Sequence, residues 1–377
     1  MPLARPPAPV DPADIVAVAA DLDRRIKDYI ARGTFDDDVF ERLALDLYAY
    51  QYAANEPYRA YCDRIGRPPD LLQRWIDVPA LPTSAFSQLR FACFPPERTK
   101  ASFLSSGTTR SNRSRLELED LSLYDASLLA QFKRMVLPDA ARIRFIVLAP
   151  PFFEAPNSSL SYMFSRLSEV YGTAEDGFYL HDDELDYHGA ARALREASEP
   201  MLVAGTAFAF VHFFDRAIES GADFALPRGS RVIETGGFKG RSRTVERDEL
   251  YGWFTQILGV PREMCAAEYG MCELGSQWYE GNIADACANR WPHFEVKVAP
   301  HWAGHAIVDR VTAQPLHDAG EPGLLQVFDL SNRGSVCAVL TSDLARDTDG
   351  GFFLMGRAPG EPPRGCSIAV DAALGRW

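Results

Sequence analysis

The fold is decided by the stretch Met201-Leu-Val-Ala-Gly-Thr206, which is followed directly by the apolar segment Ala207–Ile218. The first six residues have the length and apolar content of a buried strand, and the second segment is typical of a helix. Two more apolar runs predict buried strands, Arg144–Pro150 ending at a Pro-Pro turn and Ser230–Gly237 ending at two glycines. Strands that alternate with helices predict a largely parallel α/β sheet, with ligands near the carboxyl ends of the strands.

Regions of different pattern precede and follow this α/β part. From Pro12 to about Asn55 the apolar residues recur at helical spacing and predict two or three helices. From about residue 291 the chain changes to short strands separated by Gly, Asp and Asn, which predicts a β meander or small barrel. We therefore expect three parts: a helical part over 1–100, a core over 101–355 and a short tail over 356–377.

Composition excludes several classes of function. The chain has 377 residues, with 47% hydrophobic and 24% charged residues, as in an ordinary soluble protein. A net charge of −13 argues against nucleic-acid or anionic-membrane binding, although a local basic pocket for a nucleotide remains compatible with it. The seven scattered cysteines contain no C-x-x-C pair and indicate reduced thiols. With no apparent signal peptide and no apolar run long enough to span a bilayer, we expect a cytoplasmic protein.

The segment 104–115 has the composition of an anion-binding loop. It places four hydroxyl side chains around Gly107 and then adds three arginines. Glycine allows a tight turn, and hydroxyl and N–H donors with nearby cations suit a polyphosphate. The Walker pattern G-x-x-x-x-G-K-[ST] is absent, and a solvated surface loop is the alternative. The hydroxyl residues are Ser105, Ser106, Thr108 and Thr109, and the arginines are Arg110, Arg113 and Arg115.

A second candidate segment is Glu234–Arg241, which follows a predicted strand. The paired glycines Gly236 and Gly237 would let a flat ring or a phosphate approach the backbone, and Lys239 adds a positive charge. The alternative is a tight turn without a ligand.

Two further segments carry carboxylates. In Glu268–Leu274, Tyr269 would stack on a base and Glu273 would supply an oxygen ligand to Mg²⁺; the alternative is a helix N-terminus with acidic residues. The strand Val339–Asp343 ends in a carboxylate, which suits hydrogen bonds from ribose hydroxyls or, alternatively, a cap on a turn.

In this order and at this spacing, the segments resemble the adenylate-forming ligases. The likeness runs from about residue 80 to the tail, and its nearer branch is the acyl-protein synthetase (LuxE) family, with phenylacetate-CoA ligases as more distant kin. Glu234–Gly240, Tyr269–Leu274 and Gly356-Arg357 with Arg364-Gly-Cys366 carry the resemblance. It implies an adenylate-forming large domain with parallel α/β subdomains and a small β meander or barrel.

The resemblance also implies a role for each matching residue. Ser105–Thr109, with Arg113, would hold the ATP phosphates, and Gly236 and Gly237 would lie against the adenine or the acyl carbonyl. Tyr269 would flank the adenine, Glu273 would bind Mg²⁺, Asp343 would bind the ribose and Arg357 would lie at a hinge. Cys366 corresponds to a cysteine that takes up the acyl group as a thioester.

The sequence departs from the family pattern at several positions. Arg110 replaces a glycine, Arg113 and Arg115 replace a lysine, and Cys272 replaces a threonine. Only 20 residues follow Arg357, so we expect the usual small C-terminal domain and its catalytic lysine to be missing. Lys239 is our candidate for the cation that assists carboxylate attack in its place.

The predicted function is ATP- and Mg²⁺-dependent activation of a carboxylic acid to acyl-AMP, with a fatty acid as the expected substrate, followed by transfer of the acyl group to Cys366. A partner protein (a reductase, transferase or carrier) would then accept the acyl group. The alternatives are an acyl-CoA ligase of the phenylacetate type, in which Cys366 is idle, and a non-catalytic subunit of an acyl-transfer or reductase complex. The scatter of His293, His301 and His305 is typical of structural histidines, and His212 is expected in the core.

Overall fold

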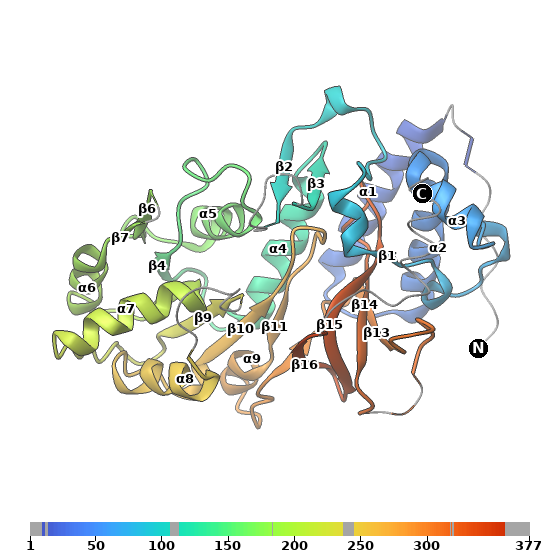
Figure 1. The fold of residues 1–377 in the computed structure, drawn as a ribbon. Coiled ribbons are helices and arrows are strands. Elements are labelled where there is room, and N and C mark those ends of the chain that lie inside the picture. Colours follow the sequence, from blue (N-terminus) through green and yellow to red (C-terminus); the bar gives the residue numbers. More distant parts are fainter. Residues whose placement is uncertain are drawn as a thin grey trace. The chain divides into compact units, whose positions relative to one another are not determined.

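The computed structural model describes residues 10–11, 14–105, 113–182, 184–236, 245–316, 318 and 320–358. Its helices and strands are drawn in Figure 1. By its internal contacts the chain divides into two compact units. Unit 1 comprises residues 1–130, 270–277 and 298–377, and unit 2 comprises residues 131–269 and 278–297.

Unit 2 contains the parallel sheet that the sequence predicts. Its strands follow the order β11-β10-β9-β8-β4-β5, with β12 next to β11. All neighbours from β10 to β5 pair in parallel, and β11 pairs antiparallel with β10. The strands are β4 (Arg144–Leu148), β5 (Gly177–Phe178), β8 (Met201–Thr206), β9 (Arg231–Thr235), β10 (Cys265–Tyr269), β11 (Trp278–Glu280) and β12 (Val296–Val298), and β6 (Leu180–His181) pairs with β7 (Glu184–Leu185).

The helices of unit 2 begin where capping residues predict. Thr206, the last residue of β8, accepts a hydrogen bond from Ala209 N at 3.1 Å and so starts the helix that follows. Ser158 caps the helix Ser159–Tyr171 in the same way, by accepting from Ser161 N at 3.1 Å. The helices are α5 (Ser159–Tyr171), α6 (Tyr187–Arg195), α7 (Ala207–Glu219), α8 (Arg247–Gln256) and α9 (Asn282–Cys287).

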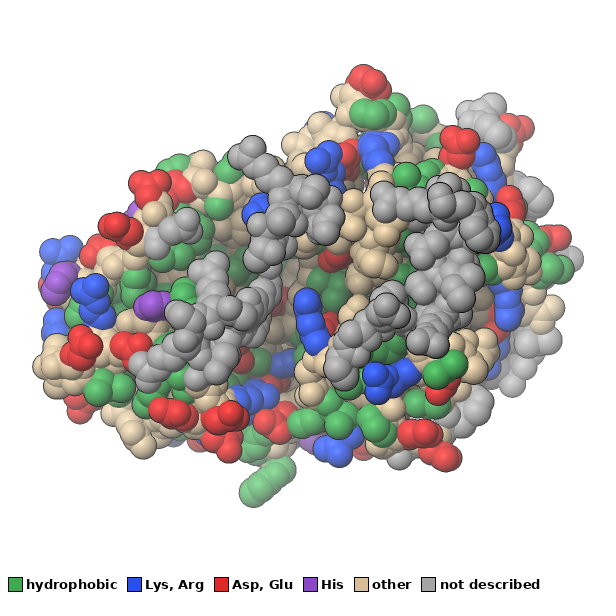
Figure 2. Space-filling model, in the orientation of Figure 1, with side chains coloured by type: hydrophobic (Ala, Val, Ile, Leu, Met, Phe, Trp, Pro, Cys, Tyr) green, Lys and Arg blue, Asp and Glu red, His purple; other side chains and the backbone are tan. Residues whose placement is uncertain are grey.

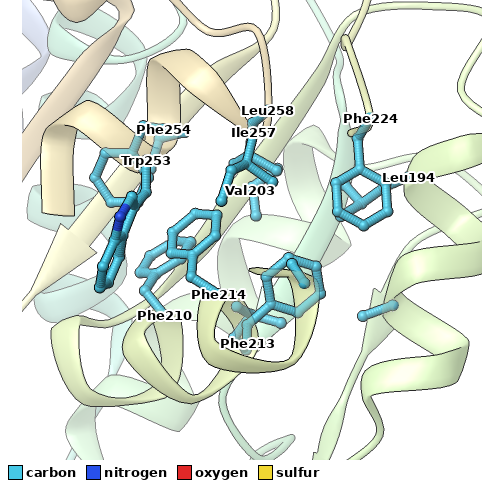
Figure 3. Packing of buried hydrophobic residues seen from close by; sticks show 14 of the residues in the cluster. Leu194, Val203, Phe210, Phe213, Phe214, Phe224, Trp253, Phe254, Ile257 and Leu258 are labelled. Atoms are coloured by element: carbon cyan, nitrogen blue, oxygen red, sulfur yellow. The ribbon is translucent and has the colours of Figure 1, made fainter. Parts of the chain in front are cut away.

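An aromatic core fills the space between α7, α8 and the sheet. Phe210, Phe213 and Phe214 of α7 are buried, and Figure 3 shows them together with Trp253 and Phe254 of α8. The rings of Phe210 and Phe254 meet edge to face, with their centroids 4.9 Å apart. Phe210, Phe213 and Phe214 therefore belong to the core, whereas Phe208 of the same helix is only partly buried.

Unit 1 contains the predicted meander. Strands β13 (Ala303–Val308), β14 (Gly323–Asp329), β15 (Ala338–Thr348) and β16 (Gly351–Arg357) pair antiparallel in chain order. The short β1 (Leu81–Pro82) adds to β15 in parallel. A separate hairpin is formed by β2 (Ala101–Leu104) and β3 (Arg115–Leu118).

The helices of unit 1 confirm the periodicity of the N-terminal region. They are α1 (Ile15–Arg32), α2 (Asp37–Ala54) and α3 (Glu56–Arg64), and α4 (Ser122–Met135) contains the boundary between the units. Gly33 ends α1 with a φ of 73°, a left-handed conformation that favours glycine. Asp36 starts α2 by accepting a hydrogen bond from Val39 N at 3.1 Å.

Two expectations from the sequence are wrong. Asp343 does not end a strand, because β15 pairs with β16 as far as Thr348 and Asp343 lies opposite Arg357 within that pairing. His212 is exposed and not in the core, since α7 turns this position outward while its neighbours Val211 and Phe213 face the core. The strand β10 also decides between the two readings of Glu268–Leu274: Glu268 and Tyr269 end a strand and do not begin a helix.

The surface carries both signs of charge. On the face drawn in Figure 2, acidic and basic side chains are interspersed among small apolar areas. Within the described residues, no helix combines the length and the apolar character that crossing a membrane requires.

Candidate functional site

Ser105 and Ser114 close the base of the Ser/Thr-rich loop in unit 1. Ser105 N donates to Ser114 O at 2.9 Å, and Ser114 N donates back to Ser105 Oγ at 2.9 Å. These bonds extend the β2–β3 hairpin by one further pair, so the loop leaves the hairpin from a fixed base. Arg113 is exposed at this base, while Arg115 pairs with Glu117 at 3.5 Å.

The segment with Glu273 lies against this base. Cys272 Sγ is 3.8 Å from Ser114 O and donates to Glu273 Oε2 at 3.2 Å. Unit 1 therefore brings together two predicted site segments that are 158 residues apart at their contact, the base of the hairpin at Ser114 and the segment Cys272-Glu273.

Glu273 is buried without a basic partner. Its exposed fraction is 6%, and within the described part of the chain no Lys, Arg or His forms an ion pair with it. Its backbone is fixed, because Asn332 Nδ2 donates to Glu273 O at 2.8 Å. A buried carboxylate normally has a cation or several donors, so this one has unused capacity for a cation.

Asp343 and Arg357 face each other across β15 and β16. They are opposite each other in the register, with Arg357 Nε 3.7 Å from Asp343 Oδ1. Asp343 N donates to Thr341 Oγ1 at 3.1 Å, which holds the backbone at a point just before a bulge in the pairing. The Asp343 side chain is 17% exposed and that of Arg357 81% exposed. The predicted ribose and hinge residues are thus neighbours.

Gly236 and Tyr269 lie at the carboxyl ends of adjacent strands in unit 2. The preceding residues Thr235 and Glu268 are paired across β9 and β10, and Thr235 Oγ1 donates to Glu268 Oε2. Gly236 has a φ of +67°, and no heavy atom of a described residue lies within 4 Å of the position that a Cβ would occupy. Tyr269 is 9% exposed, and its ring meets Trp278 edge-on at 6.2 Å. The sheet therefore brings together the two residues predicted to contact the base.

A buried network of charges beside these strands was not predicted. Glu280 is fully buried and is bound by Lys297 Nζ at 3.1 Å and by Arg247. Burial would raise the pKa of Glu280, but the positive charges of Lys297 and Arg247 outweigh it and lower that pKa. Glu234 accepts a hydrogen bond from the Tyr251 hydroxyl at 3.1 Å, and burial raises the pKa of Glu234. Single lysine and glutamate residues in strands carry no sequence signal for such a pairing.

The histidines and most cysteines have structural surroundings. His293 Nδ1 lies 2.8 Å from Asp285, His301 Nε2 lies 2.8 Å from Tyr29 O, and His305 Nε2 lies 3.0 Å from Asp347. No group of three or more potential metal ligands of the His, Cys, Asp and Glu types occurs among the described residues. Burial raises the pKa of Cys62 and of Cys93 to about 12, as expected of inert thiols.

Several predicted site residues lie outside the described part of the chain, and their roles remain predictions. They are Ser106, Gly107, Thr108, Thr109, Gly237, Lys239 and Cys366.

Comparison with solved structures identifies the fold. A 2-hydroxyisobutyryl-CoA ligase in the postadenylation state, in complex with 2-HIB-AMP, matches with a TM-score of 0.63 at 12% identity, covering 89% of this chain and 73% of that one. An open conformation of a 2-hydroxyisobutyryl-CoA ligase, in complex with 2-HIB-AMP and CoA, gives a TM-score of 0.62 at 13% identity, covering 84% and 74%. The fold is that of the adenylate-forming ligases.

Sequence comparison then identifies the family. The model of the acyl-protein synthetase (LuxE) family matches residues 9–374, so the chain belongs to that family. A long-chain-fatty-acid–luciferin-component ligase of Vibrio harveyi is 23% identical over 347 residues, covering 88% of this chain and 87% of the relative. The ligase of the same name from Aliivibrio fischeri is 23% identical over 315 residues, covering 81% and 79%.

Proposed function

We propose that this protein is an ATP-dependent acid–thiol ligase that activates a long-chain fatty acid as acyl-AMP and passes the acyl group to a thiol. Membership of the acyl-protein synthetase family supports the proposal, as do two relatives named as ligases of a long-chain fatty acid and a luciferin component. The structural observation that carries it is the contact of Cys272, whose thiol donates to Glu273, with Ser114 at the base of the Ser/Thr-rich hairpin.

The first step forms an acyl adenylate. A carboxylate oxygen of the acid attacks the α-phosphorus of ATP, the new O–P bond forms, and the bond to the β-phosphate breaks with release of pyrophosphate. Catalysis of such a step rests on alignment and on stabilisation of the phosphate charge. We assign phosphate binding to Ser105–Thr109 and Arg113, and assistance of carboxylate attack to Lys239.

We assign the remaining contacts of the nucleotide within each unit separately. In unit 2, Gly236, Gly237 and Tyr269 would bind the adenine. In unit 1, Asp343 would accept hydrogen bonds from the ribose hydroxyls, and Arg357, which already faces it at 3.7 Å, would mark the hinge.

The residues present fit a bound Mg²⁺. Proteins hold this ion through one or two carboxylates together with substrate phosphates and water, and Glu273 is a buried carboxylate without a basic partner among the described residues. Bound there beside the phosphates, Mg²⁺ would neutralise the charge that develops on the pyrophosphate leaving group. Glu273 would hold it, with Cys272 donating to one carboxylate oxygen and fixing the orientation of the other.

The second step transfers the acyl group to sulfur. The Cys366 thiolate attacks the acyl carbonyl, the S–C bond forms, and the C–O bond to AMP breaks. The cation of Arg364, two residues earlier in the sequence, would favour the thiolate. A partner protein then accepts the acyl group. The alternative is direct transfer of the acyl group from AMP to CoA, without an acyl-enzyme.

ATP–pyrophosphate exchange tests the adenylation step. With a panel of carboxylic acids of increasing chain length, we expect exchange that depends on a long-chain fatty acid and on Mg²⁺. Glu273→Gln should reduce the exchange rate about 100-fold or more, whereas the exposed matched variant Glu97→Gln should not change it. The proposal is overturned if no acid of any chain length or ring type supports exchange.

A radiolabelled fatty acid tests the acyl-enzyme. After incubation with ATP, label should remain on the denatured wild-type protein and be released by hydroxylamine, as a thioester is. Cys366→Ser should abolish this labelling but not pyrophosphate exchange, and Cys287→Ser serves as the control cysteine. Acyl-CoA formed at the wild-type rate by Cys366→Ser, with no labelled protein in either enzyme, would establish direct transfer to CoA instead.

A further inference from the structure

Asp329, at the end of β14 in unit 1, is a fully buried carboxylate without a cation. Its exposed fraction is 0%, and no ion pair joins it to a described Lys, Arg or His. It accepts four hydrogen bonds instead. Oδ1 accepts from Ser276 Oγ at 2.7 Å, Ser331 Oγ at 2.7 Å and Ser331 N at 3.0 Å, and Oδ2 accepts from Gly275 N at 2.9 Å.

These bonds join the segment that carries Glu273 to the turn after β14. Gly275 and Ser276 lie two and three residues after Glu273, and Ser331 lies in the turn. The backbone at Gly275 lies so close to the turn that a Cβ on this residue would be 2.6 Å from Ser331 Oγ. Only glycine therefore fits at this position. Asn332, the next residue of the turn, donates from Nδ2 to Glu273 O at 2.8 Å. The turn therefore contacts this segment at Glu273 and again at Gly275, two residues later.

The chemistry of the four donors requires a carboxylate. Two of them are backbone N–H groups, which can only donate, and a carboxylate is the side chain that offers acceptors alone. An asparagine at this position would turn an NH₂ group toward at least one of these donors. The network continues through Ser127 Oγ, 2.8 Å from Ser276 Oγ, and through Trp302 Nε1, 3.0 Å from both serines.

Burying a charged carboxylate costs free energy, and packing alone does not require it. Burial raises the pKa of Asp329 in spite of the four hydrogen bonds, which means that the folded protein holds the charged form at some expense. An apolar side chain of similar size would avoid that expense. A carboxylate here instead fixes the orientation of one particular segment.

We propose that Asp329, through Gly275, Ser276 and the turn at Ser331–Asn332, is a positioning residue that sets the place of the Glu273 carboxylate for Mg²⁺·ATP. The inference rests on the proposed function, because Glu273 matters only if the nucleotide binds there. Asp329 itself contacts neither metal nor substrate. Residues that hold a metal ligand in place change metal affinity or activity about 10- to 100-fold when they are removed.

The test compares Asp329→Asn with wild type in Mg²⁺ dependence. In pyrophosphate exchange, we expect the Mg²⁺ concentration at half-maximal rate to rise about tenfold or more, with the KM for the fatty acid changed less than twofold. Calorimetric titration with α,β-methylene-ATP and Mg²⁺ gives a readout that does not depend on turnover, and should show a similar loss of affinity.

Two further variants separate positioning from loss of structure. Asp285→Asn also removes a buried carboxylate, one that binds Arg290 and His293 in unit 2, so it should lower stability without shifting the Mg²⁺ dependence. Ser331→Ala removes one side-chain hydrogen bond to Asp329, so it can test the proposal even if Asp329→Asn does not fold. It should shift the Mg²⁺ dependence in the same direction as Asp329→Asn, but by a smaller factor.

The outcomes distinguish the two proposals. If wild type shows neither exchange nor nucleotide binding, the proposed function fails. If wild type is active and both Asp329→Asn and Ser331→Ala keep its Mg²⁺ dependence and nucleotide affinity, or if Asp285→Asn shifts them equally, the positioning role is overturned while the proposed function stands.

Discussion

The Tyr251 hydroxyl donates to Glu234 Oε1 at 3.1 Å, and so joins the strand before the glycine-rich loop to the helix after it. Glu234 lies in β9, two residues before Gly236, and Tyr251 lies in α8. Arg247, the first residue of α8, donates to the same hydroxyl at 3.0 Å. The two ends of the segment between β9 and α8 are thus tied by one buried phenol, and burial raises the pKa of that phenol well above its usual value.

Tyr251→Phe should therefore remove the hydrogen bond that joins α8 to β9. It removes the hydroxyl that donates to a buried Glu234 oxygen, and we expect the free energy of unfolding to fall by about 1–2 kcal/mol. Urea denaturation measures this change. The loss in stability should be matched by Tyr58→Phe, which removes a buried hydrogen bond to Pro79 O in unit 1. If Gly236 binds the nucleotide, only Tyr251→Phe should raise the KM for ATP. An equal rise in this KM in both variants would show that the Tyr251–Glu234 hydrogen bond does not position Gly236.

Glu280→Gln should be strongly destabilising. It leaves Lys297, 4% exposed, and Arg247 without their shared counter-ion, and removing one partner of a buried pair costs about 3–5 kcal/mol. The double variant Glu280→Gln/Lys297→Met should lose less stability than the two single variants added together, because it removes both charges of the Glu280–Lys297 pair. Additive losses in denaturation experiments would show that the two charges do not interact.

Acid should weaken the ion pair between Asp139 and Arg231. The Arg231 guanidinium, which is 2% exposed, donates to both Asp139 oxygens at 2.9 and 3.0 Å and lowers the pKa of that carboxyl below its usual 3.8. Because the folded-state pKa is the lower one, the pair adds stability above about pH 4 and loses it as the pH falls through the folded value.

Asp139→Asn should accordingly cost about 1 kcal/mol at pH 7, a small figure because Asp139 is 44% exposed. The difference from wild type should shrink as the pH falls below about 4 and through the lowered folded-state pKa of Asp139, as urea denaturation at a series of pH values would measure. Asp349→Asn, an exposed matched variant in the turn between β15 and β16, should follow wild type throughout. A difference that stays constant from pH 3 to pH 8 would show that the pair contributes no charge-dependent stability.

Local signals in the sequence predicted most of the fold. The helix Ser159–Tyr171 is found as expected because Ser158 caps it and its apolar residues recur at helical spacing. The strands around Met201–Thr206 are continuous apolar runs, as buried parallel strands require. The extension of β15 beyond Asp343 was missed because it depends on pairing with β16 and on a bulge, neither of which local composition reveals.

The candidate site was only partly predictable for a related reason. Motif order indicated Gly236, Tyr269, Glu273 and Asp343, but not what holds them. Asp329 and Glu280 are the last residues of the mostly apolar strands β14 and β11, and Lys297 lies between two valines in β12. Their burial arises only when segments distant in sequence pack together, so no local pattern distinguishes them from surface residues.

Cys272 stands where the family usually has a threonine, and its thiol takes over the donor role of a hydroxyl. Its Sγ donates to Glu273 Oε2 at 3.2 Å and is 3.8 Å from Ser114 O. Cys272→Ala removes the donor and should lower the pyrophosphate-exchange rate about three- to tenfold, the worth of one weak hydrogen bond to a charged group. Cys272→Thr restores a donor at that position and should recover most of the rate, while Cys265→Ala, a buried cysteine in unit 2, serves as the control. Equal rates for the alanine and threonine variants would show that the thiol only fills space.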